Sequence, residues 1–244
     1  MKHNYLKHMF TALLLLCATV ASAQDFEVDG ICYNITDATN KTVEVTYGEN
    51  KYTGSVAIPA VVSYNNVSYS VTSIGNSAFS GCNSLTSIII PKSVTSIGNS
   101  AFGSCNSLTS IIIPESVTSI GEWAFNRCFG LTNITLPEGI TSIGNRAFGD
   151  CNSLTSIIIP KSVTSIEANT FWYCESLTNI TIPEGVISIG EGAFWYCSSL
   201  TSITIPNSVR SIEAYAFGGC GNLTSITIPY KVKSIRNSAF YDCI

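Results

Sequence analysis

The chain has 244 residues, of which 45% are hydrophobic and only 11% are charged, and its formal net charge is −4. An average soluble domain has about 25% charged residues, so this chain is poor in ionisable groups. Both histidines, His3 and His8, lie in the first nine residues. Removal of that segment on export would leave no histidine, which excludes histidine metal sites and catalytic pairs of serine or cysteine with histidine. An acidic chain also argues against nucleic acid as a partner, because nucleic-acid binding requires a basic surface.

Residues 1–23 are predicted to be a cleavable signal peptide. Lys2 and Lys7 precede an apolar run from Met9 to Val20, and Ala21-Ser22-Ala23 supplies the small residues of a cleavage site. The run is shorter than the roughly 20 apolar residues that span a bilayer, and no other stretch of the sequence could cross a membrane. We therefore expect a mature chain that begins at Gln24 and is secreted or displayed at the cell surface.

Residues 24–70 are predicted to form an N-terminal β cap. Asp29-Gly30 between apolar flanks is typical of a hairpin turn, and residues 42–47 and 52–58 read as strands. The second of these ends like a degenerate first repeat, and the next repeat starts only after an insertion from Ala60 to about Ser70, which we interpret as a β-hairpin. A block of this kind would protect the edge and the apolar end of the first rung of a repeat array.

Residues 71–244 repeat with a period of 23. The unit L-x-x-I-x-I-P-x-x-V-x-x-I-x-x-x-A-F-x-x-C-x-x is complete in residues 108–130, and its leucine, proline, phenylalanine and cysteine recur at the same step along the chain. A fixed period of 20 to 29 residues with this apolar core is typical of a leucine-rich-repeat solenoid. Because one unit cannot bury its apolar face alone, stability must come from stacking of neighbouring units.

The secondary structure of one unit follows from its spacing. Ile88 and Ile90 alternate inward as in a strand, and Pro91 ends that strand. Residues 94–97 predict a second short strand, and the spacing of apolar residues in 97–105 predicts a helical turn. The predicted fold is therefore a β-rich (α/β) right-handed solenoid, in which each rung contributes a strand of a parallel ladder, a second short strand and a helical turn.

Eight cysteines, from Cys82 to Cys243, also recur at the step of 23. In a secreted protein they suggest disulfides, but the Cβ atoms of stacked rungs point in parallel directions and do not converge. A linear column also cannot surround a metal ion tetrahedrally. We predict buried free thiols, no bound metal and no cofactor.

The repeat unit strongly resembles that of the BspA-like class of bacterial leucine-rich-repeat proteins. The match covers nearly the whole mature chain, and the opening from Phe26 to Tyr33 is similar to the start of such secreted proteins. The resemblance implies a solenoid displayed at the cell surface, with adhesion to host proteins or to other cells. It implies no catalytic residues.

Three outer surfaces of the predicted solenoid could bind a partner. The first is the strand face, with outward columns of threonine, of serine or asparagine, and of isoleucine or threonine, which strand propensity and contacts between rungs would also produce. The second is a charged column after the prolines, which alternates in sign and is interpreted as solvated. It consists of Lys92, Glu115, Glu138, Lys161 and Glu184. The acidic residues are dispersed and lack the spacing of a calcium site.

The third surface is aromatic. The positions that follow the core phenylalanine are small or polar in most rungs but aromatic in two adjacent ones. The candidate binding residues are Trp172, Tyr173, Trp195 and Tyr196, with Trp123, Tyr215 and Tyr241 in the same or nearby columns. Partly exposed aromatic rings could bind an apolar patch of a protein or a sugar ring. The alternative is that these rings only stack on one another and shield the coil.

The sequence therefore predicts a secreted or cell-surface, non-enzymatic protein whose rigid solenoid binds an extracellular or host surface protein. Two alternatives are a carbohydrate-binding protein that uses the aromatic platform and a structural repeat spacer without a ligand. A hydrolase is disfavoured, because paired carboxylates such as Glu167 and Glu191 have no supporting pocket in this pattern. The repeats reach Cys243-Ile244 without a second cap, so end-to-end contact through the C-terminal edge is a further expectation.

Overall fold

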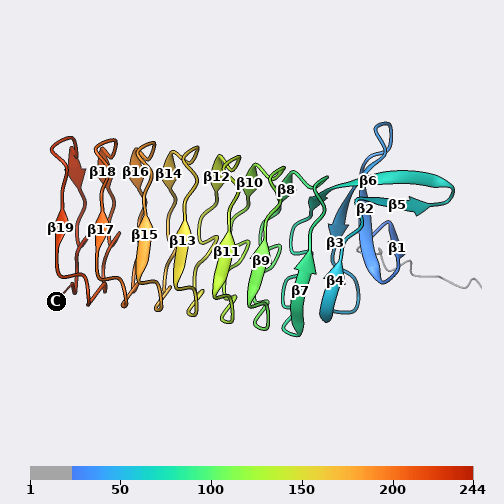
Figure 1. Ribbon diagram of the computed structural model, residues 1–244, viewed down its shortest axis with the longest axis horizontal. Coiled ribbons are helices and arrows are strands. Elements are labelled where there is room, and N and C mark those ends of the chain that lie inside the picture. The colour runs from blue at the N-terminus through green and yellow to red at the C-terminus, as the bar shows by residue number, and fades with distance from the viewer. Residues whose placement is uncertain (1–23, 244) are drawn as a thin grey trace, which may run out of the picture.

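The computed structural model describes residues 24–243, so the predicted signal peptide lies outside the described residues. The described chain is an elongated coil of stacked rungs with a small sheet at its N-terminal end (Figure 1). Each rung from β7 onward contains one 23-residue unit, and the predicted solenoid with parallel strand ladders is confirmed. No helix that is long and apolar enough to cross a bilayer occurs in this part of the chain.

Two columns of short parallel strands run along the coil. The first column consists of β4 (Gly54–Ala57), β7 (Leu85–Ile89), β9 (Ser110–Ile112), β11 (Asn133–Thr135), β13 (Ser156–Ile158), β15 (Asn179–Thr181), β17 (Ile203–Thr204) and β19 (Ile226–Thr227). Its strands pair two by two, β4 with β7, β9 with β11, β13 with β15 and β17 with β19. We call its outer surface the strand face. Residues that are one period of 23 apart in the sequence lie opposite each other in neighbouring strands, as Ile111 and Ile134 do.

The second column is narrower. It consists of β8 (Ser96–Ile97), β10 (Ser119–Ile120), β12 (Ser142–Ile143), β14 (Ser165–Ile166), β16 (Ser188–Ile189), β18 (Ser211–Ile212) and β20 (Ser234–Ile235). In the strands from β8 to β18 the isoleucine is buried in the coil and the serine is more exposed, whereas Ile235 of the last strand is 48% exposed. This column continues strand β6 (Val67–Ile74) of the N-terminal sheet, which pairs with β8 in parallel.

The core is a set of columns of identical side chains. The phenylalanine rings from Phe79 to Phe240 stack rung upon rung, with centroids 5.1 to 5.7 Å apart and planes within 9° of parallel. The leucine, isoleucine, valine and alanine columns are buried around them. Close packing of this kind fixes the spacing between rungs, so the outer surfaces are presented on a rigid support.

The prediction of free thiols is confirmed for the nine cysteines of the described chain. Each repeat thiol from Cys105 onward donates a hydrogen bond to the carbonyl oxygen of the core phenylalanine in the preceding rung, with Sγ–O distances of 3.0 to 3.2 Å. The sulfur atoms therefore have partners in the backbone and not in one another. Burial raises the pKa of these thiols, to about 12 for Cys220.

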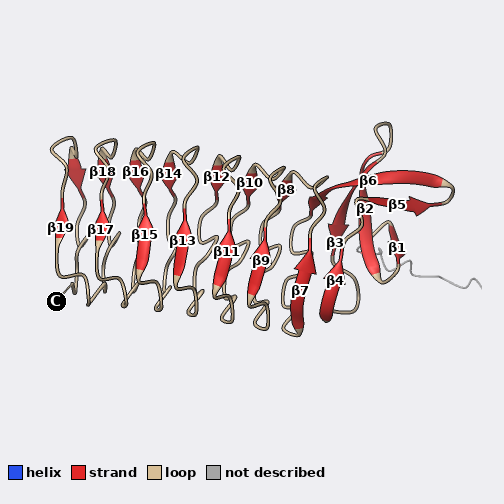
Figure 2. Ribbon diagram, viewed as in Figure 1, coloured by secondary structure: helices blue, strands red, loops and turns tan. Residues whose placement is uncertain are grey.

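The predicted helical turn is absent from residues 24–243, where the segment is a series of turns (Figure 2). Two residues of this segment in each rung have a left-handed backbone, such as Ser100 and Ser104 at φ 54° and 60°. They direct amide groups sideways, so that Phe102 donates to the carbonyl of Ala124 in the next rung at 2.7 Å. Lateral backbone bonds of this kind alternate with bonds inside the segment, such as that from the Gly103 amide to the Ser100 carbonyl at 3.0 Å, in place of a continuous helical series. We call the surface of these turns the flank.

The N-terminal sheet begins with β1 (Phe26–Val28), β2 (Ile31–Asp37) and β3 (Thr42–Thr46), which pair antiparallel in that order. Strand β3 then pairs in parallel with β6, and β5 (Val61–Tyr64) pairs antiparallel with β6 around Asn65-Asn66. Both asparagines have positive φ, at 49° and 62°, as a two-residue hairpin turn of this kind requires. The sheet therefore runs without interruption into the second strand column. A protective role for residues 24–70 stays a prediction.

Candidate functional site

The flank carries the predicted aromatic residues, and several of them occupy unfavourable backbone positions. Ten of the sixteen left-handed positions in the eight rungs hold serine, glycine, asparagine or aspartate, and two hold arginine. Trp123, Tyr173, Tyr196 and Tyr215 adopt the same conformation, with φ from 56° to 59°. A left-handed backbone costs roughly 1 kcal/mol or more for a residue with a Cβ. Chain stability alone therefore does not explain four bulky aromatic residues at these positions.

The C-terminal part of the aromatic group is a continuous series of ring contacts. Tyr215 stacks on Trp195 with a centroid distance of 5.0 Å, and Trp195 stacks on Tyr196 at 5.8 Å. Tyr196 contacts Tyr173 at 4.7 Å, and Tyr173 meets the edge of Trp172 at 4.6 Å. These residues belong to three consecutive rungs, so the contacts run along the axis of the solenoid.

An arginine extends this series toward the N-terminus. The guanidinium carbon of Arg146 lies 4.6 Å from the ring centroid of Trp123 and 4.7 Å from that of Trp172. A cation over an aromatic ring is attracted by the ring quadrupole, and the planar guanidinium suits this position better than a lysine ammonium. The aromatic band is Trp123, Arg146, Trp172, Tyr173, Trp195, Tyr196 and Tyr215. It crosses five consecutive rungs.

The next rung holds part of the band in place. The Trp195 ring lies over Gly218, where a Cβ atom would stand 3.4 Å from Trp195 Cδ1, and Tyr196 lies against Gly219, where a Cβ atom would stand 2.6 Å from Tyr196 Cδ1. Only glycine leaves room for the Tyr196 ring in this position. The next rung therefore fixes the positions of these two rings in the absence of a partner.

The structure brings together six of the seven residues predicted from the sequence. Within residues 24–243, Tyr241 makes no ring contact with the band, because Gly218 occupies the equivalent position in the rung between Trp195 and Tyr241. Sequence reasoning missed Arg146. The sequence does show that Arg146 occupies the same repeat position as Trp123 and Ser100 in the two rungs before it, and a long cationic side chain in that column could have been noticed.

Charged residues neighbour the band, among them Glu122 and Glu175. Arg127 and Asp150 form an ion pair at 3.4 Å beside it. Burial is the main cause that raises the pKa of Tyr173, and the neighbouring Tyr196 and Asp150 raise it further. The Tyr173 hydroxyl therefore stays neutral at physiological pH. Trp123 is 38% exposed, and the other aromatic rings of the band are partly buried. The Trp195 Nε1 atom is buried without a hydrogen-bond partner among residues 24–243, so the band presents partly exposed rings and the Arg146 guanidinium to solvent.

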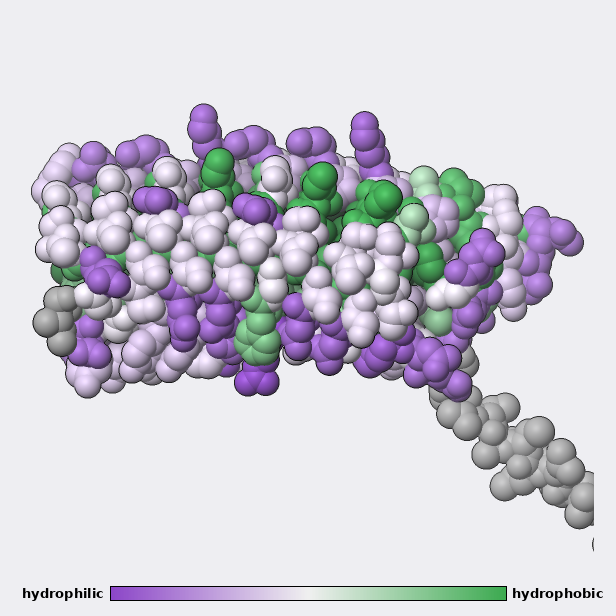
Figure 3. All heavy atoms as spheres, turned by 60° about the horizontal axis from the view of Figure 1, so that its bottom comes forward, coloured by the Kyte–Doolittle hydropathy of each residue, from purple (hydrophilic) through white to green (hydrophobic). Residues whose placement is uncertain are grey.

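The strand face has a different character. Ile89, Ile112 and Ile158 are exposed there, but Thr135 interrupts the column, and Figure 3 shows isolated hydrophobic patches in place of a continuous stripe. Threonine hydroxyls on this face bond to the backbone of the preceding rung, for example Thr132 to the Thr109 carbonyl at 3.0 Å. Much of its polar surface is therefore already used to hold the rungs together.

The fold and the flank together define a leucine-rich-repeat solenoid with one irregular surface. The family model for the BspA type leucine rich repeat region matches residues 61–178 and 124–244, with six copies of the repeat. The chain belongs to this family, and the resemblance seen in the sequence is confirmed.

Two solved structures show the same architecture. A leucine rich cell surface protein from Faecalibacterium prausnitzii is 29% identical with a TM-score of 0.66, and the alignment covers 88% of this chain and 73% of that one. The T. pallidum leucine rich repeat protein is 27% identical with a TM-score of 0.59, and the alignment covers 90% of this chain and 92% of that one. No functionally curated protein matches the sequence.

Proposed function

We propose that this chain is a secreted or cell-surface binding protein without enzymatic activity, and that its aromatic band contacts an extracellular protein in adhesion or protein–protein interaction. The observation that carries the proposal is the band itself, in which an arginine between two tryptophans continues into a series of stacked rings. Similarity to a protein described as a cell surface protein supports the location.

The composition of the band supports a protein as the partner. Tryptophan, tyrosine and arginine are the residues most enriched among those that dominate binding energy at protein interfaces. The band crosses four steps between rungs, and stacked phenylalanines set each step at 5.1 to 5.7 Å. It is therefore about 20 Å long, the size expected for the centre of an interface that buries about 800 Å² on each partner. Because the rings already contact one another and the next rung supports two of them, less conformational entropy would be lost on binding than with separate side chains.

The ring contacts favour protein over carbohydrate as the partner. A sugar binds an aromatic platform through an open ring face. Arg146 lies over a face of both Trp123 and Trp172, and Trp195 stacks on Tyr196 and Tyr215. The partly exposed remainder of the rings and the guanidinium are left for the partner, and these suit backbone carbonyls, carboxylates and apolar side chains of a protein.

The test replaces band residues with those that neighbouring rungs carry at the same positions. Trp123→Ser, Trp172→Gly and Trp195→Gly restore the residues found at Ser100, Gly149 and Gly218, so the solenoid is expected to fold. Tyr230→Ser is the control, because Tyr230 is 84% exposed and lies outside the band. The mature chain and both variants are measured against a panel of purified extracellular-matrix proteins and against a glycan array.

We expect the wild type and the control to bind a protein of the panel, and the triple variant to bind at least about a hundredfold more weakly with an unchanged circular dichroism spectrum. Equal binding by the triple variant would refute a role for the band. Binding to glycans alone would favour the carbohydrate alternative, and binding to neither class would favour a structural spacer.

A further inference from the structure

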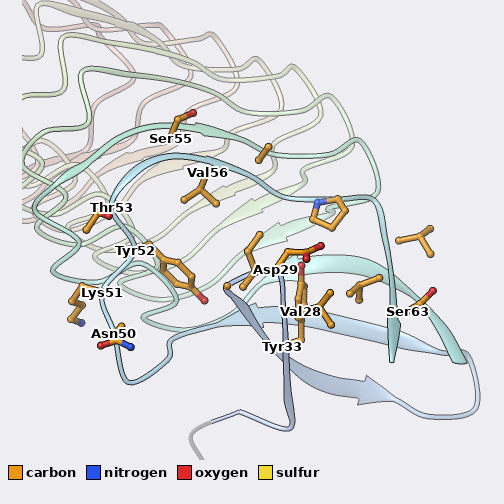
Figure 4. A pocket seen from close by; sticks show the side chains of 16 residues that line it. Val28, Asp29, Tyr33, Asn50, Lys51, Tyr52, Thr53, Ser55, Val56 and Ser63 are labelled. Carbon is orange, nitrogen blue, oxygen red and sulfur yellow. The ribbon is translucent and has the colours of Figure 1, made fainter. Parts of the chain in front are cut away.

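The N-terminal end of the coil contains a hollow of about 670 Å³ (Figure 4). None of the residues that line it belongs to the aromatic band. It lies between the turn that joins β1 to β2, the segment 50–53, and strands β4 and β5. Its lining mixes aliphatic side chains with hydroxyl, amide and charged groups. A concave site with a few polar groups that converge on it is the usual form of a binding site.

One buried hydroxyl group in this hollow, that of Tyr33, lacks a hydrogen-bond partner in the described chain. Tyr33 is 0% exposed and lines the hollow, and its hydroxyl finds no hydrogen-bond partner among residues 24–243. Figure 4 shows its ring directed toward Asp29. The neighbouring Tyr52 is satisfied, because its hydroxyl accepts from the Cys32 amide at 3.0 Å and donates to the Thr46 carbonyl at 2.7 Å. Buried polar groups are nearly always paired, so the Tyr33 hydroxyl points to a missing ligand atom.

The hollow also borders the open edge of a strand. Strand β4 pairs only with β7 within the described chain. The amides of Gly54 and Ile58 donate to the β7 side, at 2.8 Å to Ser84 and 3.0 Å to Ile89. Backbone groups alternate along an extended strand, so those of Ser55 and Ala57 face away from β7. Both residues line the hollow, which therefore offers unpaired strand donors and acceptors.

The charges around the hollow select for a cation. Asp29 lines it, and the Asp29 carboxylate contributes, after burial, to the raised pKa of Tyr33, so the two groups interact. Lys51 is the basic residue of the lining, and its ammonium group already donates to the Ser80 carbonyl. Glu27 and Glu49 line an adjoining recess. A ligand that supplies an amino or guanidinium group would satisfy both Asp29 and the Tyr33 hydroxyl.

We propose that this hollow binds an extended peptide segment of a partner protein, which adds as a strand to the free edge of β4 and places a lysine or arginine side chain beside Asp29 and Tyr33. Strand addition supplies backbone hydrogen bonds for affinity, and the pocket beside the strand supplies the choice of side chain. The hollow and the aromatic band lie on different parts of the molecule, so this site stands or fails independently of the band.

The experiment uses the mature chain and two fluorescein-labelled peptides of alternating valine and threonine, one with a central lysine and the other with a central glutamate. Binding is followed by fluorescence polarisation. Tyr33→Phe removes the unpartnered hydroxyl, Asp29→Asn removes the charge, and Ala57→Pro removes an outward amide, a change that an edge strand tolerates. The matched controls are Tyr64→Phe and Glu184→Gln. Tyr64 stacks on Phe26 but does not line the hollow, and Glu184 lies at a distance from it.

We expect saturable binding of the lysine peptide and at least tenfold weaker binding of the glutamate peptide. Tyr33→Phe should weaken binding about fivefold, and Asp29→Asn about tenfold, while the controls bind as the wild type does. Ala57→Pro should abolish binding. The urea midpoint of Tyr33→Phe should be unchanged or raised, whereas a structural role for the hydroxyl would lower it.

Three results would overturn the proposal. The first is that the lysine peptide does not bind, or that Tyr33→Phe and Asp29→Asn both bind it as tightly as the wild type does. The second is binding of N-acetyl-lysine-methylamide as tightly as the peptide and without effect of Ala57→Pro, which would indicate a pocket for small cations. The third is a dimer in light scattering that Ala57→Pro dissociates, which would identify a second copy of this chain as the occupant.

Discussion

The cysteine column should make the stability of this protein depend steeply on alkaline pH. Six thiols, from Cys105 to Cys220, are 0% exposed, and each donates its proton to a backbone carbonyl. Burial raises the pKa of every one of them, to about 12 for Cys220. A thiolate in the same place would lose both its solvation and its hydrogen bond.

The direction of the effect follows from proton linkage. In the unfolded chain a cysteine ionises near pH 8.5. Below that pH the thiols are protonated in both states, and their contribution to the free energy of unfolding is fully present. As the pH rises above it, the unfolded chain releases protons that the folded chain keeps, so the free energy of unfolding falls until the pH approaches the folded pKa.

The magnitude is large because six sites act together. One pH unit above the unfolded pKa, at pH 9.5, each thiol lowers the free energy of unfolding by about 1.4 kcal/mol. Six such thiols lower it by about 8 kcal/mol, which is comparable with the whole stability of many domains, about 5 to 15 kcal/mol. Tyr33, whose pKa is raised by burial to about 12, adds a similar loss only above the ordinary tyrosine pKa near 10.

The assay is urea unfolding followed by far-ultraviolet circular dichroism at pH 7.5, 8.5 and 9.5, with a phosphine reductant to prevent oxidation. The control is a variant with Cys128→Ala, Cys151→Ala and Cys174→Ala. It should be less stable at pH 7.5, because packing and three hydrogen bonds are lost, yet its further loss at pH 9.5 should be smaller by about 4 kcal/mol. The reasoning is refuted if the wild type shows no pH dependence, or if the variant shows the same dependence as the wild type.

Two further predictions concern individual residues. Under denaturing conditions without reductant, a thiol reagent should titrate all nine cysteines of a chain that begins at Gln24, whereas in the native state the partly exposed Cys243 should react first; a denatured titre of one or none would show that disulfides form. Gly219→Ala should destabilise the fold by about 1 to 2 kcal/mol in urea unfolding, because the residue has φ +69° and the new Cβ would meet Tyr196 at 2.6 Å. Gly221→Ala is its control, since nothing lies within 4 Å of the added Cβ, and equal effects of the two changes would contradict the proposed packing.

Residue spacing predicted most of the fold. The recurrence of Leu108, Pro114, Phe125 and Cys128 every 23 residues can be satisfied only if equivalent side chains stack, so the register of the ladders follows directly from the sequence. The same stacking excludes disulfides, because neighbouring sulfur atoms point in parallel directions. For a strictly periodic chain, local pattern and tertiary packing agree, and little else is needed.

The helical turn shows where this agreement ends. The spacing of Ile97, Ala101 and Cys105 is compatible both with a helical turn and with a chain of turns that faces the core with the same residues. The difference lies in every second backbone amide, which would bond within the segment in a helix but bonds to the next rung here. Only the neighbouring rung provides the lateral acceptors, such as the Ala124 carbonyl for the Phe102 amide. The sequence of one unit therefore does not show which of the two backbone conformations forms.

For the candidate sites as well, some features follow from the sequence and others only from the tertiary structure. The sequence alone identified the aromatic side chains of the flank, because a periodic chain makes every departure from its consensus visible. Only the tertiary structure decided that Arg146 joins Trp123 to Trp172, that Tyr241 stands apart from the band, and that the unpaired edge of β4 meets the buried hydroxyl of Tyr33 in one hollow. Repetition determines which residues share a column, but the direction of a side chain and the partner of a strand edge depend on what the adjacent rung or the N-terminal sheet places beside them.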